Sequence, residues 1–164
     1  MIDNALRSLD LALSHAIGAA QWLALPIAAL LLLQWPLREV VARFSREAND
    51  FGQVAFALYV SVALTSAMRA GAHLHTDVLS HRYSPRVQRA LAILGLLLAL
   101  IPWSVFVLVA HFDSARRSLG LLESFPDTSN PGYFIIKLAA WLMAMLLLLQ
   151  SLVELIRLLR ADHQ

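Results

Sequence analysis

The sequence predicts an all-α integral membrane protein with four transmembrane helices and two amphipathic arm helices at the membrane interface. Hydrophobic residues make up 59% of the 164 positions and charged residues only 15%, which differs strongly from the usage of soluble domains. Four apolar stretches are long enough to cross about 30 Å of hydrocarbon, and they cover residues 16–35, 51–70, 88–112 and 132–156. Only short termini and connectors remain, so we expect a single membrane domain over residues 1–164.

Charge and cysteine content argue against several classes of protein. The formal net charge is +2, and the basic residues are spread among the connectors, which disfavours a nucleic-acid surface. The sequence has no cysteine, which excludes disulfides, thiol catalysis and cysteine metal sites. The first apolar stretch is too long for a signal peptide, and its leader has only Arg7 against Asp3 and Asp10, so we expect it to be retained as a helix.

The first span contains Pro26, which we expect to kink it, and it ends at Trp35 and Pro36. Residues 37–47 follow with a stripe of apolar side chains at helical spacing, formed by Leu37, Val40, Val41 and Phe44. This spacing predicts the first arm helix, lying along the interface. A solvated loop is the alternative.

The second span follows a capping signal in which Asp50 precedes Gln53 by three residues, with Asn49 as the alternative cap. Small residues recur along this span and allow close approach of another helix; they are Gly52, Ala55, Ala57, Ser61, Ala63, Ser66 and Ala67.

At the end of the second span, polar residues recur at every fourth position: Ser61, Thr65, Arg69, His73 and Asp77. A helix that continued through Gly71 would place them on one stripe, named here the polar seam. We expect the hydroxyl residues to join helices inside the bilayer and Arg69 to reach the lipid headgroups. The rest of the polar seam would then hold the helix end and its connector. A solvated helix end is the alternative.

The third span begins at Ser84 and Pro85, a helix cap followed by proline at the first helical position. Pro102 predicts a kink inside the bilayer, and no clear stop occurs before about Glu123. Residues 112–123 keep an apolar face and predict the second arm helix.

The fourth span begins with a similar signal, Asn130 followed by Pro131. Lys137 lies a turn or two inside this span, and we expect it to extend to the membrane surface.

The chemistry of the spans disfavours a stand-alone transporter. Such a protein needs a titratable or ion-coordinating group near the middle of the membrane. The central parts of the four spans contain no Asp, Glu, Lys or Arg, and Lys137 and Glu154 lie at span edges. Small multidrug exporters also have four helices, but they rely on a buried glutamate that this chain lacks.

Two ligand-binding alternatives remain weaker. A haem-carrying or structural membrane anchor of a respiratory complex would need two histidines at matching depth, whereas His73 and His111 close consecutive antiparallel helices. His73, His75 and Asp77 have the spacing of metal ligands, although such residues beside arginines are more often a solvated loop. No catalytic motif is present, so we expect no catalytic, cofactor or metal site.

These features together resemble a transporter family. Four spans, an arm after the first, Asn49 before the second and the run MRAGAHLHTDVL resemble the small membrane subunit of tripartite ATP-independent periplasmic (TRAP) transporters, the DctQ-like family. The matching positions are Arg69, Gly71, His73 and Asp77, while His75 stands where a basic residue is common. The fourth helix opens with SNPGYFIIKLAAWLMA, and its Pro131, Gly132 and Lys137 are similar to a subgroup often associated with organic and oxo acids.

The resemblance implies a non-enzymatic subunit of the bacterial inner membrane. In that family a large membrane subunit contains the sodium and substrate sites and moves as an elevator, a periplasmic binding protein delivers an organic acid, and the small subunit braces the large one. The resemblance also implies no cofactor in this chain, contacts with membrane lipids, and both termini in the cytoplasm. Charge bias does not decide the orientation, because seven basic residues lie on one side of the four spans and six on the other.

Overall fold

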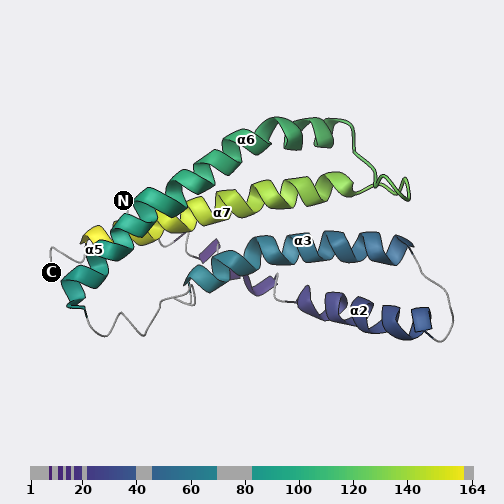
Figure 1. The fold of residues 1–164 in the computed structure, drawn as a ribbon, viewed down its shortest axis with the longest axis horizontal. Coiled ribbons are helices and arrows are strands. Elements are labelled where there is room, and N and C mark those ends of the chain that lie inside the picture. The colour runs from purple at the N-terminus through teal and green to yellow at the C-terminus, as the bar shows by residue number, and fades with distance from the viewer. Residues whose placement is uncertain are drawn as a thin grey trace.

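A computed structural model describes residues 8, 11–12, 14–15, 17–19, 22–39, 46–69 and 83–160 of the chain. In these ranges the chain is helical apart from turns and the loop at residues 121–132 (Figure 1). The elements are α2 (Ala24–Glu39), α3 (Arg46–Arg69), α5 (Pro85–Gly95), the π-helical segment η1 (Leu96–Leu100), α6 (Ile101–Gly120) and α7 (Tyr133–Arg160). The described ranges contain no strand, apart from an isolated bridge between Ser124 and Pro131. The all-helical fold class is therefore confirmed.

Three helical segments are long and apolar enough to cross a membrane. They are α3, the continuous 36-residue run Pro85–Gly120 and α7, so the chain is a multi-pass membrane protein. The helix α2 has 16 residues, or about 24 Å at 1.5 Å per residue, which is less than the hydrocarbon thickness. It follows a turn at Trp22 and Leu23. Some of residues 16–35 are not among the residues that the structure describes. The count of four spans is therefore not confirmed.

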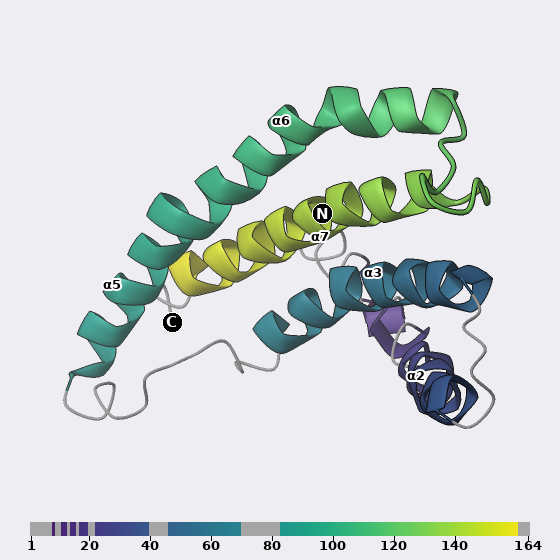
Figure 2. The ribbon, with the colours of Figure 1, turned by 45° about the vertical axis from the view of Figure 1, so that its right-hand side comes forward.

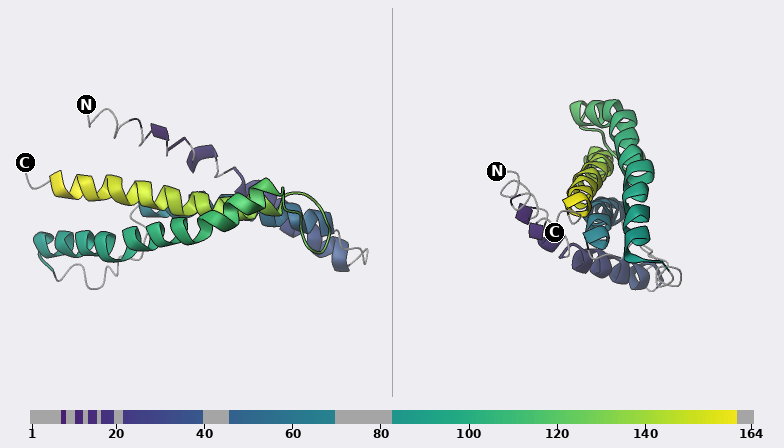
Figure 3. Two further views of the ribbon diagram at one scale, coloured as in Figure 1. Left: turned by 90° about the horizontal axis from the view of Figure 1, so that it is seen from above. Right: turned by 90° about the vertical axis from the view of Figure 1, so that its left-hand side faces the viewer.

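The three long helices are arranged around α7. Figure 1 shows α7 between α6 and α3, with α3 and α7 running in the same direction and α6 running the opposite way. In α7, 33% of the most apolar stretch is buried, against 17% in α3 and 11% in Pro85–Gly120. The helix α2 packs on α3 and crosses it obliquely (Figures 2 and 3). Helix α7 is therefore the centre of the bundle, and the other helices leave most of their apolar surface on the outside.

The region of the first predicted arm differs from expectation. Helix α2 continues through Pro36 to Glu39, beyond the residues expected to mark the exit of the first span from the membrane; that exit at Trp35 and Pro36 stays a prediction. Residues 37–39 belong to α2, residues 46–47 belong to α3, and residues 40–45 lie outside the described residues. Pro26 lies in the first turn of α2, where a missing N–H costs no helical hydrogen bond. No separate arm helix appears in the described part of residues 37–47.

The long helix Pro85–Gly120 is interrupted just before Pro102. Ser84 and Pro85 start it as predicted, although the Ser84 side chain makes no capping hydrogen bond. In η1 the N–H of Ile101 donates to the carbonyl of Leu96, five residues earlier. Proline lacks an N–H, and its ring clashes with the carbonyl four residues before it, so a wider turn accommodates it. The kink expected from Pro102 thus takes the form of a π-helical segment.

The second predicted arm is not a separate helix. Residues 112–120 continue α6, which ends at Gly120. Figure 2 shows that the last turns of α6 bend away from the direction of its earlier part. Ala115 and Ser118 are buried there, in the helix that packs on α7. The expectation that the third helix has no stop before about Glu123 agrees with the end of α6 at Gly120, and the position of residues 112–123 at the membrane interface stays a prediction.

Polar side chains lie in the interior of the helix bundle. The buried ones are Ser61 and Thr65 of α3, Ser104 and Ser118 of α6, and Gln150 and Ser151 of α7. The hydroxyls of Ser61, Ser104 and Ser151 each donate to a carbonyl of their own helix, at 2.7, 2.8 and 2.6 Å. Small residues that satisfy themselves in this way let helices approach closely. Ser61 and Thr65 are buried as expected, but the Ser61 hydroxyl does not cross to another helix.

Candidate functional site

The carboxylate of Asp50 joins α3 to the loop between α6 and α7. Asp50 lies in the second turn of α3 and is 7% exposed. Its Oδ2 accepts hydrogen bonds from Thr128 Oγ1 at 2.5 Å and from Asn130 Nδ2 at 3.1 Å. The Thr128 hydroxyl also accepts from the backbone N–H of Asn130 at 3.4 Å. These three residues are named here the Asp50 tie.

The predictions that Asp50, Asn49 and Asn130 cap helices are wrong. Helix α3 begins at Arg46, so Asp50 and Asn49 lie inside the helix and neither is its cap. Helix α7 begins at Tyr133, so Asn130 and Pro131 precede it without starting it. The polar side chains of Asp50 and Asn130 instead bind each other. Local pattern cannot separate a capping carboxylate from one that bonds a distant loop, because both follow the same residue preferences.

The loop between α6 and α7 is held in an unusual backbone conformation. Leu122, Ser129 and Gly132 have positive φ angles of 45°, 56° and 128°. Two backbone hydrogen bonds close the loop, from the Phe125 N–H to the Asn130 carbonyl at 2.8 Å and from the Ser129 N–H to the Phe125 carbonyl at 2.9 Å. Phe125 is only 5% exposed and therefore anchors the loop.

An ion pair closes the same end of the bundle. Lys137 Nζ of α7 lies 2.6 Å from Glu123 Oε2, just beyond the end of α6. The same oxygen accepts a 2.5 Å hydrogen bond from Ser118 Oγ. Hydrogen bonds from Lys137 and then Ser118 lower the pKa of Glu123 and outweigh the opposing effect of burial. Lys137 is thus held by a residue just beyond the end of α6, and its expected reach to the membrane surface stays a prediction.

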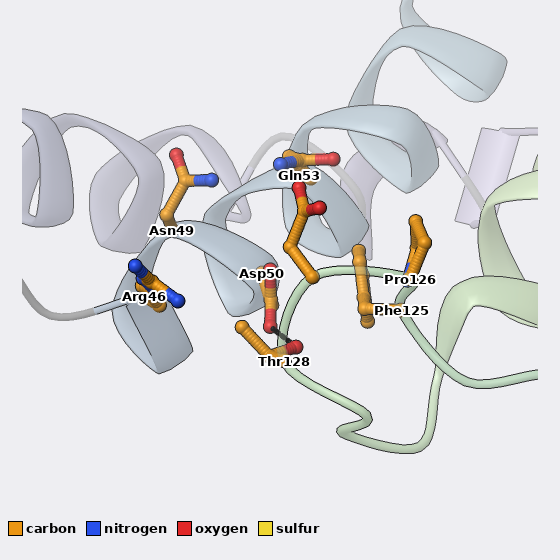
Figure 4. A pocket seen from close by; sticks show the side chains of 8 residues that line it. Arg46, Asn49, Asp50, Gln53, Phe125, Pro126 and Thr128 are labelled. Atoms are coloured by element: carbon orange, nitrogen blue, oxygen red, sulfur yellow. Dashed lines mark hydrogen bonds between the residues drawn. The ribbon is translucent and has the colours of Figure 1, made fainter.

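A recess of about 370 Å³ lies beside the Asp50 tie. It is named here the polar recess and is shown in Figure 4. First turns of α3 form one wall and the α6–α7 loop forms the other, and the lining residues are Arg46, Asn49, Asp50, Gln53, Phe125, Pro126, Asp127 and Thr128. The recess therefore combines charges of both signs, two amides and an apolar side.

The predicted motif residues fall at the two ends of α3. Asn49 lines the polar recess, and Lys137 forms the ion pair near it. Arg69 is the last residue of α3, at the other end of the helix. Gly71, His73 and Asp77 lie outside the described residues, so the polar seam beyond Arg69 stays a prediction. Asn49 and Arg69 are separated by 20 residues of α3, or about 30 Å at 1.5 Å per residue.

The described site offers hydrogen bonding and ion pairing as its chemistry. Within the described ranges, no group of three His, Cys, Asp or Glu side chains is placed to hold a metal ion. His73, His75 and Asp77, the metal alternative from the sequence, lie outside those ranges and remain untested. Between α6 and α7, Trp141 Nε1 donates to the Leu108 carbonyl at 3.3 Å. These interactions fix helices and loops relative to one another.

Sequence reasoning did not identify Glu123, Thr128 or Trp141 as contact residues. Glu123 stands 14 residues before Lys137, too far for a helical pair, so only the reversal of the chain brings them together. The run from Asp127 to Asn130 is typical of a turn, but turn composition does not reveal a partner. A tryptophan inside an apolar helix did carry a usable signal, because a buried indole N–H generally finds an acceptor.

Comparison with known proteins gives one match. The family model of the DctQ component of tripartite ATP-independent periplasmic transporters matches residues 20–161 of the 164-residue chain. Neither a curated protein nor a solved structure matches the chain significantly. The matched residues include every helix from α2 to α7, the Asp50 tie and the ion pair.

Proposed function

Because the chain belongs to the DctQ component family of TRAP transporters, we propose that it is the non-catalytic subunit that braces the large transport subunit in a sodium-coupled uptake system for organic acids. The family match over residues 20–161 is the observation that supports this proposal most directly. It makes the chain a small component of a tripartite transporter. It does not support the alternative, a haem-carrying or structural anchor of a respiratory complex.

The distribution of polar groups supports a bracing role over a transporting one. The Asp50 tie and the Lys137–Glu123 pair join distant parts of the chain at one end of the bundle, and the hydrogen bond from Trp141 to Leu108 joins α7 to α6 along their length. Among the residues that the structure describes, the buried polar side chains inside the bundle are hydroxyls and one amide, apart from Asp50 at its end. Such groups set helix spacing. We propose that sodium and substrate bind the large subunit, and that this chain contains no cofactor or metal site of its own.

The outer face of Pro85–Gly120 is suited to a membrane partner. Leu98, Phe106 and Val109 are 75%, 68% and 73% exposed, and α5 contains no buried residue. A continuous apolar face of this kind contacts lipid or another membrane subunit. The proposed partners are the large TRAP membrane subunit, the periplasmic substrate-binding protein and membrane lipids, with no nucleic acid.

In the proposed topology, α2 and the residues before it form the first of four spans. Both termini then lie in the cytoplasm and the protein lies in the bacterial inner membrane. Helices α3 and α7 run in the same direction, and α6, which lies between them in the sequence, runs the opposite way (Figure 1). These directions are compatible with the proposed topology. Reporter fusions at Gln164 and near Asn49 test it, and both reporters on the same side would refute it.

We also propose that Arg69, Gly71, His73 and Asp77 hold the end of the second span and its connector without contacting substrate. Asp77→Ala is then expected to lower the yield or thermal stability of the assembled transporter, because removal of one partner of a partly buried charge pair costs a few kcal/mol. Normal assembly with a many-fold change in substrate affinity would contradict this role.

The proposed function is tested by uptake into proteoliposomes with a sodium gradient and the binding protein. Three preparations are compared: this chain alone, the large subunit alone, and both together. Uptake is expected only where the large subunit is present, and highest with both. Uptake by this chain alone would overturn the proposal, and so would a stable, active homodimer that needs no partner.

A further inference from the structure

The polar recess contains side chains whose capacity for hydrogen bonding is unused. Among the described residues, the side chains of Arg46, Asn49, Gln53 and Asp127 make no ion pair or hydrogen bond. Arg46 carries a positive charge, Asp127 a negative one, and the amides both donate and accept. The volume of about 370 Å³ is within the range of small-ligand sites, about 300–1,000 Å³. The recess therefore matches a polar group that has both charges.

An apolar groove adjoins the polar recess. It shares Asp50 and Phe125 with the recess and has a volume of about 390 Å³. Its apolar wall is formed by Phe51, Val54 and Ile135 near the starts of α3 and α7, and Glu47, Asn130, Pro131 and Gly132 complete the lining. Phe51 is 61% exposed. Both helices are long enough to span the bilayer, so their first turns lie where headgroups give way to hydrocarbon. A polar recess and an apolar groove thus meet at the depth where a phospholipid has the same two parts.

We propose that this paired site binds one phospholipid of the phosphatidylethanolamine type. Arg46, with the amides of Asn49 and Gln53, binds the phosphate, and Asp127 accepts hydrogen bonds from the ammonium group. The first part of one acyl chain occupies the groove beside Phe51 and Val54. The lipid would connect α3 with the α6–α7 loop on the membrane side of the Asp50 tie.

Charge complementarity distinguishes this lipid from other occupants. A phosphatidylglycerol headgroup has no cation for Asp127, and its net negative charge is opposed by that carboxylate. A choline headgroup has no N–H and cannot donate a hydrogen bond to Asp127. A soluble organic acid or inorganic phosphate would leave the apolar groove empty. The combination of recess and groove therefore predicts a preference for ethanolamine lipids.

Native mass spectrometry of the full-length chain in detergent tests the proposal, with titrations of dioleoyl phosphatidylethanolamine, phosphatidylcholine and phosphatidylglycerol. One ethanolamine lipid is expected to bind about tenfold more tightly than either other lipid, the effect of one charge-assisted hydrogen bond. Arg46→Gln should weaken binding of all three lipids by about tenfold. Asp127→Asn should remove the preference for ethanolamine over choline and leave the choline affinity unchanged.

Controls separate this site from general contact with lipid. Arg86→Gln alters an exposed arginine of α5, far from the recess, and should leave all three affinities unchanged. Val54→Phe fills the groove. It should weaken binding of the lipids without changing the affinity for soluble glycerophosphoethanolamine. Far-ultraviolet circular dichroism confirms that each variant is folded.

The proposal is overturned if phosphatidylglycerol binds most tightly, or if Arg46→Gln and Arg86→Gln behave alike. It is also overturned if soluble glycerophosphoethanolamine or inorganic phosphate binds as tightly as the lipid. A further contradicting result would be that Arg46→Gln abolishes binding of the periplasmic substrate-binding protein while the lipid affinities stay unchanged. The recess would then bind a protein partner and not a lipid. None of these results depends on uptake activity, so the proposed transport function and the lipid site can fail separately.

Discussion

The Asp50 carboxylate accepts a 2.5 Å hydrogen bond from the hydroxyl of Thr128, 78 residues further along the chain. This contact places the start of α3 against the loop that precedes α7, while α3 and α7 pack along their lengths. The two parallel helices are therefore fixed at one end by polar bonds and along their length by small and apolar side chains. The loop then has a defined position next to the polar recess.

Asp50→Ala is expected to destabilise the protein. The change removes the acceptor for Thr128 and Asn130 and leaves their donors without a partner in a partly buried place. Loss of a charged acceptor costs about 1.5–3 kcal/mol. Unfolding in sodium dodecyl sulfate, followed by circular dichroism, measures the change. Asp113→Ala, at an exposed position of α6, is the matched control and should be as stable as wild type. An equal loss of stability in the two variants would contradict a structural role for Asp50.

Glu123 is expected to make stability depend on pH. Its pKa in the folded protein is lowered below the ordinary 4.5, chiefly by the hydrogen bond from Lys137 and then by that from Ser118. A lowered folded pKa means that the carboxylate contributes its stability fully above pH 4.5 and loses it as the pH falls through the folded pKa. Wild type should therefore lose stability in acid below this value.

Two variants test the origin of that pH dependence. Glu123→Gln removes the titrating group, and Lys137→Met removes the main cause of the lowered pKa, so both should flatten the acid part of the stability curve. Asp113→Asn, the control, should lose stability in acid as steeply as wild type. The comparison is made by thermal unfolding in detergent over a pH series. A curve for Glu123→Gln as steep as that of wild type would show that another group titrates.

Gly132→Ala should destabilise the loop before α7. Gly132 has φ of 128°, a conformation that L side chains rarely adopt, although a new Cβ would lie 3.7 Å from Phe125, an ordinary contact distance. The cost is therefore one of backbone strain, about 1–3 kcal/mol. Gly120→Ala is the control, because a Cβ there meets nothing within 4 Å and no positive φ is found. A midpoint of thermal unfolding lowered equally by both variants would contradict this reasoning.

Pro102→Ala should straighten the long helix. The alanine supplies an N–H and removes the ring that favours the wider turn at Leu96–Leu100. The chain has no cysteine, so spin labels can be placed at Val87 and Val109, two exposed positions on either side of η1. The distance between the labels, measured by double electron–electron resonance, is expected to lengthen. An unchanged distance would mean that packing on α7 sets the bend.

The sequence by itself determined the membrane class, the helical fold and the family. Long apolar stretches can satisfy their backbone in a bilayer only as helices or closed barrels, and the predicted spans 51–70, 88–112 and 132–156 overlap α3, Pro85–Gly120 and α7 over most of their lengths. Pro102 predicted an interruption because its effect is local to one turn. The run MRAGAHLHTDVL indicated the family that the match over residues 20–161 then showed.

Only the tertiary structure decided what the polar residues at the helix ends do. Asp50 and Asn130 have the local pattern of caps, and Lys137 that of a residue reaching for the surface, yet each binds a group from another element. Ala115 and Ser118 are buried in a helix that packs on α7, a contact that the apolar face of residues 112–123 did not identify. Local sequence sets which hydrogen bonds a residue is able to make, whereas the choice among partners depends on which distant groups the packing of α3, α6 and α7 brings within reach.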